Sequence, residues 1–255
     1  PHEVAGRTAK QFKPAANGHP MRVLDPACGS GSFLIGAYQF LLDWYQQRYR
    51  EDSKTWRKHG CVFDASKNDF RLTIRERKRI LLDHIYGVDI DRQAVEVSKL
   101  SLLLKCLEGE NQGTLESLFQ MKERALPDLG DNIKCGNSIV GPDAFVDTLI
   151  GAHADDDMDA INPFNWQSEF AAVFDASGGF DAVVGNPPYI DSEWMVRHRP
   201  IEREYCADRY KAASGNWDVF CVFIERGILS LRGDGRFAYI VPNKVGSAGL
   251  ATGAR

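Results

Sequence analysis

Hydrophobic and polar positions along this chain follow two periods. Short apolar runs that end at glycine, asparagine or proline predict buried strands, and longer runs with apolar residues three or four apart predict helices. Strands are expected at residues 22–24, 85–90, 132–137, 180–186 and 236–242. Helices are expected from about Ser32, over 73–84, over 91–107 with Asp91 as the N-cap, and over 216–231. Gly233-Asp234-Gly235 is expected to turn the last helix into the fifth strand.

This alternation of strands and helices predicts the fold class. It indicates an α/β protein with a doubly wound, mostly parallel sheet and helices on both faces. In such sheets, ligands bind beyond the carboxyl ends of the strands. The unusual residues of the chain gather at these ends: Asp25 to Gly31, Asp89, Asn137, Asn186 to Tyr189, and Pro242-Asn243. We therefore expect an active site at this edge of the sheet. The connections at about 51–70 and 142–180 are longer than usual and are expected to be insertions.

Composition narrows the classes of protein. The 255 residues carry a net charge of -4, which argues against a strongly basic nucleic-acid module but allows a locally positive groove. The basic run at 71–80 is most typical of a solvated helix face. Three consecutive aspartates, Asp155 to Asp157, are more typical of a solvated loop than of a metal site.

Cysteine usage and hydropathy indicate the compartment. The six cysteines form no C-x-x-C pair, and no histidine stands at zinc-ligand spacing, so no metal is expected. Scattered cysteines in apolar strings are typical of reduced thiols in a cytosolic protein. The sequence has no signal peptide and no apolar run of membrane-spanning length, so we expect a cytoplasmic protein with no membrane partner.

The stretch "DPACGSGSF" places glycines between the first strand and the first helix. Gly29 and Gly31 allow a tight turn and a close approach of the backbone to a ligand. Such a turn fits NAD, FAD, phosphate or S-adenosylmethionine sites, and also simple tight packing. Asp89 ends the second strand, where an acidic side chain commonly accepts ribose hydroxyls. Asn137 ends the third strand, where it reads as an adenine-contacting amide or as an ordinary turn residue.

Four motifs in this order carry a resemblance to a known family: "VLDPACGSGSF", "YGVDID", "GNPPYI" and "GRFAYIVPN". They resemble those of amino-group DNA methyltransferases of the N6-adenine type. The long first motif, together with "NPFNWQSEF", looks like the Eco57I-like methylases of combined (type IIG) restriction-modification enzymes. The resemblance covers most of residues 20–245. It implies a Rossmann-like, class I fold that uses S-adenosylmethionine as cofactor.

The resemblance also implies roles for single residues. The turn after the first strand would hold the methionine part of S-adenosylmethionine, Asp89 the ribose, Ile90 the adenine ring and Asn137 the adenine edge. Many relatives carry aspartate where this chain has Asn137. The implied cofactor-binding residues are Asp25, Pro26, Ala27, Cys28, Gly29, Gly31, Asp89, Ile90 and Asn137.

The implied catalytic residues are Asn186, Pro187, Pro188 and Tyr189. The exocyclic amino group of adenine is a poor nucleophile, because its lone pair is delocalised into the ring. Two acceptors, the Asn186 side-chain carbonyl and the Pro187 backbone carbonyl, would favour the pyramidal form that develops in the transition state. The two prolines stiffen this segment. Tyr189 offers a flat ring on which a base flipped out of a DNA duplex could stack.

Two other functions remain open on the residues alone. Protein methyltransferases that modify a glutamine amide of release factors also use an N-P-P-Y sequence. A non-catalytic subunit that only binds the cofactor is the second alternative.

The expected organisation is a fragment of a longer protein. Residues 1–20 would be the remnant of a segment that closes over the cofactor, and residues 21–250 the methyltransferase catalytic domain. The last two strands of the family's sheet and a target-recognition domain are expected beyond these 255 residues. Double-stranded DNA would then be bound through the full-length protein.

Overall fold

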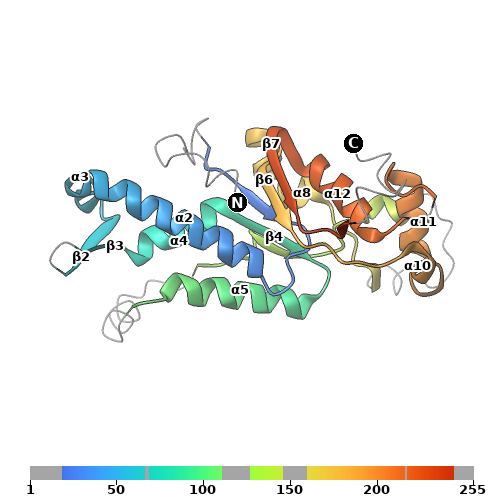
Figure 1. Ribbon diagram of the computed structural model, residues 1–255, viewed down its shortest axis with the longest axis horizontal. Coiled ribbons are helices and arrows are strands. Elements are labelled where there is room, and N and C mark those ends of the chain that lie inside the picture. Colours follow the sequence, from blue (N-terminus) through green and yellow to red (C-terminus); the bar gives the residue numbers. More distant parts are fainter. Residues whose placement is uncertain (1–18, 67–68, 111–126, 146–159, 216, 244–255) are drawn as a thin grey trace.

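A five-stranded parallel sheet forms the centre of the molecule (Figure 1). The computed structural model describes residues 19–66, 69–110, 127–145, 160–215 and 217–243. The strands lie in the order β5-β4-β1-β6-β7, and every neighbouring pair is parallel. Their bounds are β1 Val23–Asp25, β4 Ile85–Asp89, β5 Ile133–Cys135, β6 Phe180–Gly185 and β7 Leu231–Tyr239.

Helices cover both faces of the sheet, which confirms the predicted doubly wound α/β fold. One face carries α2 (Ser32–Glu51), α4 (Ile74–His84) and α5 (Arg92–Leu107). The other carries α8 (Trp166–Glu169), α9 (Ala171–Ser177) and α12 (Val219–Ser230). Asp91 caps α5 as expected, because its side chain accepts a hydrogen bond from the Gln93 backbone N–H at 2.8 Å.

Alternation along the strands builds the two cores. Val23 packs with Leu34 and Tyr38 under α2, whereas the next residue, Leu24, packs with Phe180 on the opposite face. Successive side chains of a strand point to opposite faces, so a short strand can serve both cores. Leu24, Leu34, Tyr38 and Phe180 are fully buried, and Val23 is nearly so.

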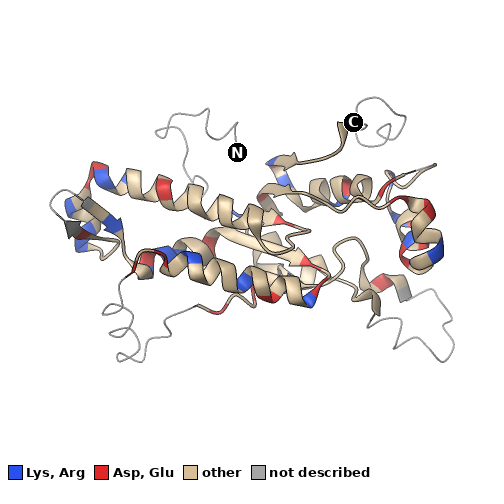
Figure 2. Cartoon of the chain, turned by 60° about the horizontal axis from the view of Figure 1, so that its bottom comes forward, with Lys and Arg blue, Asp and Glu red and all other residues tan. Residues whose placement is uncertain are grey.

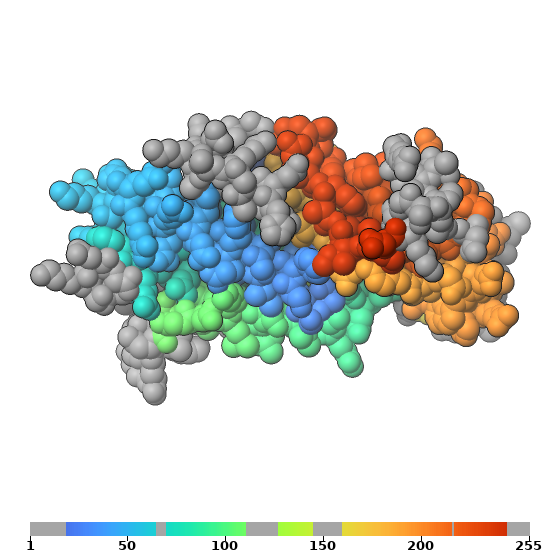
Figure 3. Space-filling model, viewed as in Figure 1, coloured from blue at the N-terminus to red at the C-terminus, as the bar shows by residue number. Residues whose placement is uncertain are grey.

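The parallel arrangement brings the carboxyl ends of the strands to one edge. Two helices, α10 (Ser192–His198) and α11 (Pro200–Arg209), follow β6 and lie beyond this edge (Figure 1). The opposite end of the molecule is formed by α3 (Ser53–Lys58) and an antiparallel hairpin of β2 (Val62–Ser66) and β3 (Asp69–Leu72) (Figure 3). The functional edge is thus separated from the insertion around residues 51–70.

Several elements differ from the sequence-based prediction. The insertion at 51–70 contains α3 and the hairpin, which the pattern of apolar positions does not show. The last strand starts at Leu231 rather than at 236, and it ends at Tyr239. The glycines of 233–235 lie within this strand, where the pairing shifts from Phe180–Leu231 to Ala182–Arg236 and so absorbs the extra residues.

Basic and acidic residues alternate along the described helices and strands (Figure 2). In the basic run, Arg79 pairs with Glu76 and Asp83, and Arg77 donates to the backbone carbonyls of Cys106 and Glu108. This part of α4 is therefore a paired face rather than a simple solvated one. None of the six cysteines is in a disulfide; four of the thiols are buried, whereas Cys61 and Cys135 are half-buried.

Neither a membrane-spanning helix nor a cluster of metal-ligating side chains occurs among the residues that the structure describes. The aspartate run at 155–157 and residues 1–18 of the expected N-terminal remnant (1–20) lie outside these residues.

Candidate active site

The glycine turn after β1 is packed tightly against α5. The Cys28 backbone N–H donates to the Val88 carbonyl at 3.0 Å, which ties the turn to β4. Gly31 has a φ of +86°, and a Cβ at this position would lie 2.5 Å from Ser98 Oγ on α5. Only glycine combines that backbone angle with this close approach. The turn therefore has a structural reason for its last glycine, independent of any ligand.

Asp25 lies at the end of β1 and is 1% exposed. Its Oδ1 accepts a hydrogen bond from the Ala27 backbone N–H at 3.0 Å. Burial raises the pKa of this carboxyl to about 7, the Ala27 N–H opposes the rise, and the negative charge of Asp89 adds to it. Asp25 is therefore a largely neutral group at mildly acidic pH.

Asp89 joins the glycine turn to the start of α5. Its Oδ2 accepts from the Gly29 backbone N–H at 2.7 Å, and its Oδ1 accepts from the Asp91 backbone N–H at 2.9 Å. A carboxylate has about four acceptor sites, so each oxygen can still accept a further hydrogen bond. Asp89 is thus held rigidly with acceptor capacity left for a ligand hydroxyl.

A cavity of about 260 Å³ opens at the carboxyl edge of the sheet. It unites residues of the glycine turn, of the β4 and β5 ends and of the segment after β6. The predicted site residues that line it are Pro26, Ala27, Asp89, Ile90, Asn137, Asn186 and Pro188. The remaining predicted residues lie around the cavity without lining it: Asp25, Cys28, Gly29, Gly31, Pro187 and Tyr189. Burial also raises the pKa of the Cys28 thiol, so it remains protonated.

Asn137 is buried and its side chain is engaged within the protein. Its Nδ2 donates to Glu202 Oε1 at 2.9 Å, and its Oδ1 accepts from the Ile139 backbone N–H at 3.2 Å. The neighbouring Ser138 Oγ donates to the Pro26 carbonyl at 2.5 Å. These bonds tie the end of β5 to α11 and to the glycine turn. Each polar side-chain atom of Asn137 thus makes one hydrogen bond, which fixes its orientation at the cavity and leaves one N–H and one acceptor position.

The segment after β6 presents Asn186 at the surface and buries Pro187. Tyr189 is 48% exposed, and its ring meets Phe220 edge-on with centroids 5.9 Å apart. Its hydroxyl lies 2.7 Å from Asn186 Oδ1 and 3.0 Å from the Ile240 carbonyl. Tyr189 therefore contacts Asn186 directly, a relation that sequence reasoning did not anticipate.

Helices α10 and α11 supply cavity residues that no sequence motif marked. Met195, Arg199 and Glu202 line the wall opposite the strand ends. Glu202 is 5% exposed, and burial raises the pKa of its carboxyl, whereas the charge of Arg199 and the bond from Asn137 oppose the rise. A buried carboxylate at a helical position has no local signature in sequence, so only the fold reveals it.

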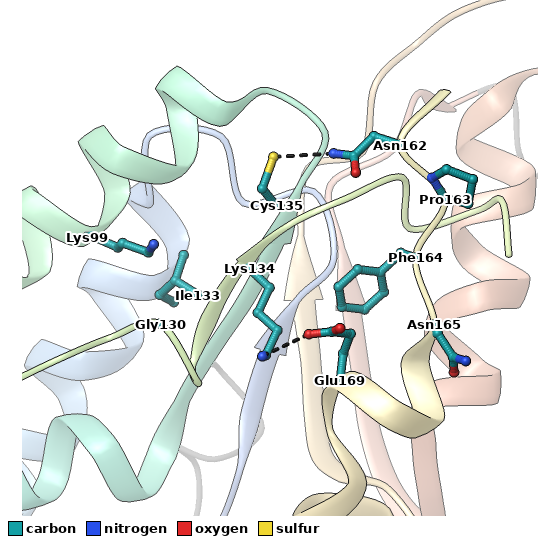
Figure 4. A pocket seen from close by; sticks show the side chains of 10 residues that line it. All are labelled: Lys99, Gly130, Ile133, Lys134, Cys135, Asn162, Pro163, Phe164, Asn165 and Glu169. Carbon is teal, nitrogen blue, oxygen red and sulfur yellow. Dashed lines mark hydrogen bonds and ion pairs between the residues drawn. The ribbon is translucent and has the colours of Figure 1, made fainter. Parts of the chain in front are cut away.

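A second cavity, of about 350 Å³, lies outside β5 and contains none of the predicted site residues (Figure 4). Its two lysines are already paired: Lys134 contacts Glu169 at 2.9 Å, and Lys99 contacts Glu96 at 3.0 Å.

Comparisons with known proteins agree with the motifs. The profile of the family described as "Eco57I restriction-modification methylase" matches residues 83–253. This chain belongs to the Eco57I restriction-modification methylase family. A second profile, "RMKL-like, methyltransferase domain", matches residues 16–114. The family predicted from the sequence is thereby confirmed.

Individual relatives are considerably longer than this chain. The type II restriction enzyme and methyltransferase RM.Eco57I of Escherichia coli is 34% identical over 86% of the chain and 20% of its own length. The adenine-specific methyltransferase PglX of Streptomyces coelicolor is 25% identical over 81% of the chain and 15% of its own length. A solved structure of a nuclease-deletion mutant of the Type ISP restriction-modification enzyme LlaGI, in complex with a DNA substrate mimic, is 15% identical over 94% of the chain and 17% of that protein, with a TM-score of 0.47.

Proposed function

We propose that this chain is the catalytic core of an enzyme that transfers a methyl group from S-adenosylmethionine to the N6 amino group of adenine in DNA, within a restriction-modification system. One observation supports this most strongly. Asn186 and Pro188, from the N-P-P-Y segment, line the same cavity as Pro26 of the glycine turn and Asp89-Ile90 at the end of β4. The two halves of the motif pair, about 160 residues apart in the chain, meet at one ligand-sized space.

The residues present fit S-adenosylmethionine. The rigidly held Asp89 carboxylate retains acceptor capacity for ribose hydroxyls, and the 37% exposed Ile90 offers an apolar surface for the adenine ring. A Cβ at Gly29 would meet no atom within 4 Å, so backbone at this point is open to a ligand. When bound, S-adenosylmethionine supplies an electrophilic methyl group on a positively charged sulfur.

The chain's own contribution to the chemistry is to orient acceptors. Asn186 Oδ1 and the Pro187 carbonyl oxygen would each accept a hydrogen bond from one of the two N–H groups of the target amino group. The prolines and the Tyr189 hydroxyl fix this segment before the substrate arrives, so little ordering entropy is lost during the reaction. Tyr189 would also stack on the target base, which must leave the duplex to reach the cavity.

DNA recognition is assigned to the whole protein. The chain spans about a fifth of RM.Eco57I, and the net charge of -4 gives it no excess of phosphate-binding groups. We propose that double-stranded DNA is held mainly by segments outside this chain. These segments would bring the target adenine to the edge of the cavity.

Two variants of the full-length protein test the assignment. Asn186→Ala should lower the rate of N6-adenine methylation about 10²–10³-fold with S-adenosylmethionine affinity nearly unchanged, as for loss of one preorganised hydrogen-bonding group. Asp89→Ala should instead weaken cofactor binding by about 1.5–3 kcal/mol. Radiolabelled methyl transfer and calorimetry measure the two effects separately.

DNA, RNA and release factor are assayed in parallel. Methylation of release factor but not of DNA would favour the glutamine-directed alternative. Cofactor binding without transfer to any of the three would favour a non-catalytic subunit. A normal methylation rate for Asn186→Ala would remove the N-P-P-Y segment from the reaction.

A further inference from the structure

Glu202 carries a buried carboxylate oxygen without a partner. The side chain is 5% exposed, and its Oε1 accepts from Asn137 Nδ2 at 2.9 Å and from Arg199 Nη1 at 3.4 Å. The other oxygen, Oε2, has no hydrogen-bond partner within the part of the chain that the structure describes. An unpaired acceptor on a buried ionisable group costs free energy, so such groups are uncommon unless something else binds them.

The missing partner can come from the cavity. Glu202 lines it together with Asn137, Asp89 and Ile90. Oε2 is itself buried, so a donor in the cavity can reach it after a small turn of the carboxyl group. Asn137 follows β5, which is three strands away from β6 and its Asn186 in the sheet order. Neighbouring strands lie about 4.8 Å apart, so the ends of β5 and β6 are separated by roughly 14 Å. Glu202 contacts Asn137 and therefore lies near the β5 end, away from Asn186.

The ligand group at this position must be an N–H or O–H donor. Ribose hydroxyls are already served by Asp89 in the proposed binding mode, and the ring surface by Ile90. Beyond these, at the β5 end, an adenine ring presents its exocyclic 6-amino group. Asn137 is held by the Ile139 N–H at Oδ1 and by Glu202 at Nδ2, so among the described residues the polar atom of this pair that makes no hydrogen bond is Glu202 Oε2.

We propose that Glu202 Oε2 accepts a hydrogen bond from the 6-amino group of the cofactor's adenine and thereby selects a 6-amino over a 6-oxo purine. This assignment rests on the proposed use of S-adenosylmethionine. Asn137 then acts as a positioning residue, which holds the carboxylate rather than the ligand. Burial raises the pKa of the Glu202 carboxyl, and the Arg199 charge and the Asn137 bond oppose that rise only in part.

Glutamine at position 202 provides a sharp test. Its carbonyl can keep the bond from Asn137 Nδ2, which places its NH₂ group where Oε2 stands. An acceptor is thus exchanged for a donor in an otherwise isosteric side chain. Glu204→Gln is the matched control, because it makes the same chemical change at an exposed position of the same helix.

The experiment measures binding, not activity, by calorimetry with the full-length protein. The ligands are S-adenosylhomocysteine and its 6-oxo counterpart, S-inosylhomocysteine. Wild type and Glu204→Gln should prefer the 6-amino ligand about 10- to 100-fold, the range for a hydrogen bond to a charged group. Glu202→Gln should lose this preference or invert it. Thermal unfolding confirms that each variant is folded.

The outcomes separate the two hypotheses. If wild type binds neither ligand, the proposed cofactor is wrong and the Glu202 assignment falls with it. If wild type binds both equally, the assignment fails without the need for any variant. If wild type discriminates and a folded Glu202→Gln discriminates equally well, the cofactor stands and only the role of Glu202 is refuted.

Discussion

The buried carboxyl of Asp25 should make the stability of the protein depend on pH in an unusual direction. Its folded-state pKa is about 7, against a usual value of 3.8. Between these values the folded protein keeps a proton that the unfolded chain has lost. The free energy of unfolding therefore falls as pH rises from about 4 to about 7, and the loss is complete above pH 7. A salt-bridged carboxylate with a depressed pKa would give the opposite slope.

The size of the effect follows from the two pKa values. They differ by about three, and each pKa unit corresponds to about 1.4 kcal/mol, so the contribution has a ceiling of about 4 kcal/mol. Asp25→Asn removes the ionisation and keeps an acceptor for the Ala27 N–H. At pH 5 the unfolded wild type is already ionised while the folded protein keeps its proton, about 1.2 pKa units past the unfolded value, so the variant should be the more stable by about 1.7 kcal/mol. At pH 8.5 the variant should be the more stable by several kcal/mol.

Urea denaturation at pH 5 and pH 8.5 measures these free energies. Contributions of all other groups largely cancel when wild type and variant are compared at the same pH. Asp43→Asn, at an exposed position of α2, controls for the loss of one negative charge. Parallel pH profiles for wild type and Asp25→Asn would show that Asp25 ionises as it does in an unfolded chain, and would refute the reasoning.

Two further predictions come from single contacts. Tyr189→Phe should lower kcat/KM for DNA methylation by about 2- to 10-fold, because it removes the hydroxyl that lies 2.7 Å from Asn186 Oδ1. Tyr189→Ala should also remove the stacking surface, which costs a further ~1–3 kcal/mol. Equal rates for wild type and Tyr189→Phe would show that the hydroxyl contact does not contribute to the reaction. Gly31→Ala should destabilise the fold by about 1–3 kcal/mol in urea, because its φ of +86° and the approach to Ser98 both disfavour a Cβ; an unchanged midpoint would contradict this.

The sequence predicted the fold, and it placed the candidate site residues at the strand ends, because both depend on local signals. Strands and helices alternate with clear periods, and parallel strands necessarily bring their carboxyl ends to one edge. Once Asp89 and Asn186 were placed at strand ends, their proximity to the same cavity followed from the topology. The family motifs then suggested the chemistry that is proposed for this edge.

Other features depend on contacts between segments far apart in the chain. Glu202 stands on α11, 65 residues after its partner Asn137, and its sequence context is that of an ordinary amphipathic helix. The bond from Tyr189 to Asn186 spans only three residues, but it requires the turn that the two prolines impose. The start of β7 was displaced because its glycines are absorbed by a shift in strand pairing, an effect of the neighbouring strand β6.

The placement of acidic groups bears on which ligand the cavity retains. Asp89 and Glu202 line it, Asp25 lies close enough to Asp89 for their charges to interact, and Arg199 is the only cation among the residues that line it in the described structure. Such a surplus of carboxylates favours a ligand with a positive sulfonium over the neutral thioether that remains after methyl transfer. If the chain methylates DNA as proposed, the same field would repel the phosphates, so the backbone of the duplex would be held elsewhere while the neutral base enters the cavity. A negatively charged chain with an acidic cavity is therefore consistent with DNA methylation, provided that the phosphate contacts lie in the larger protein.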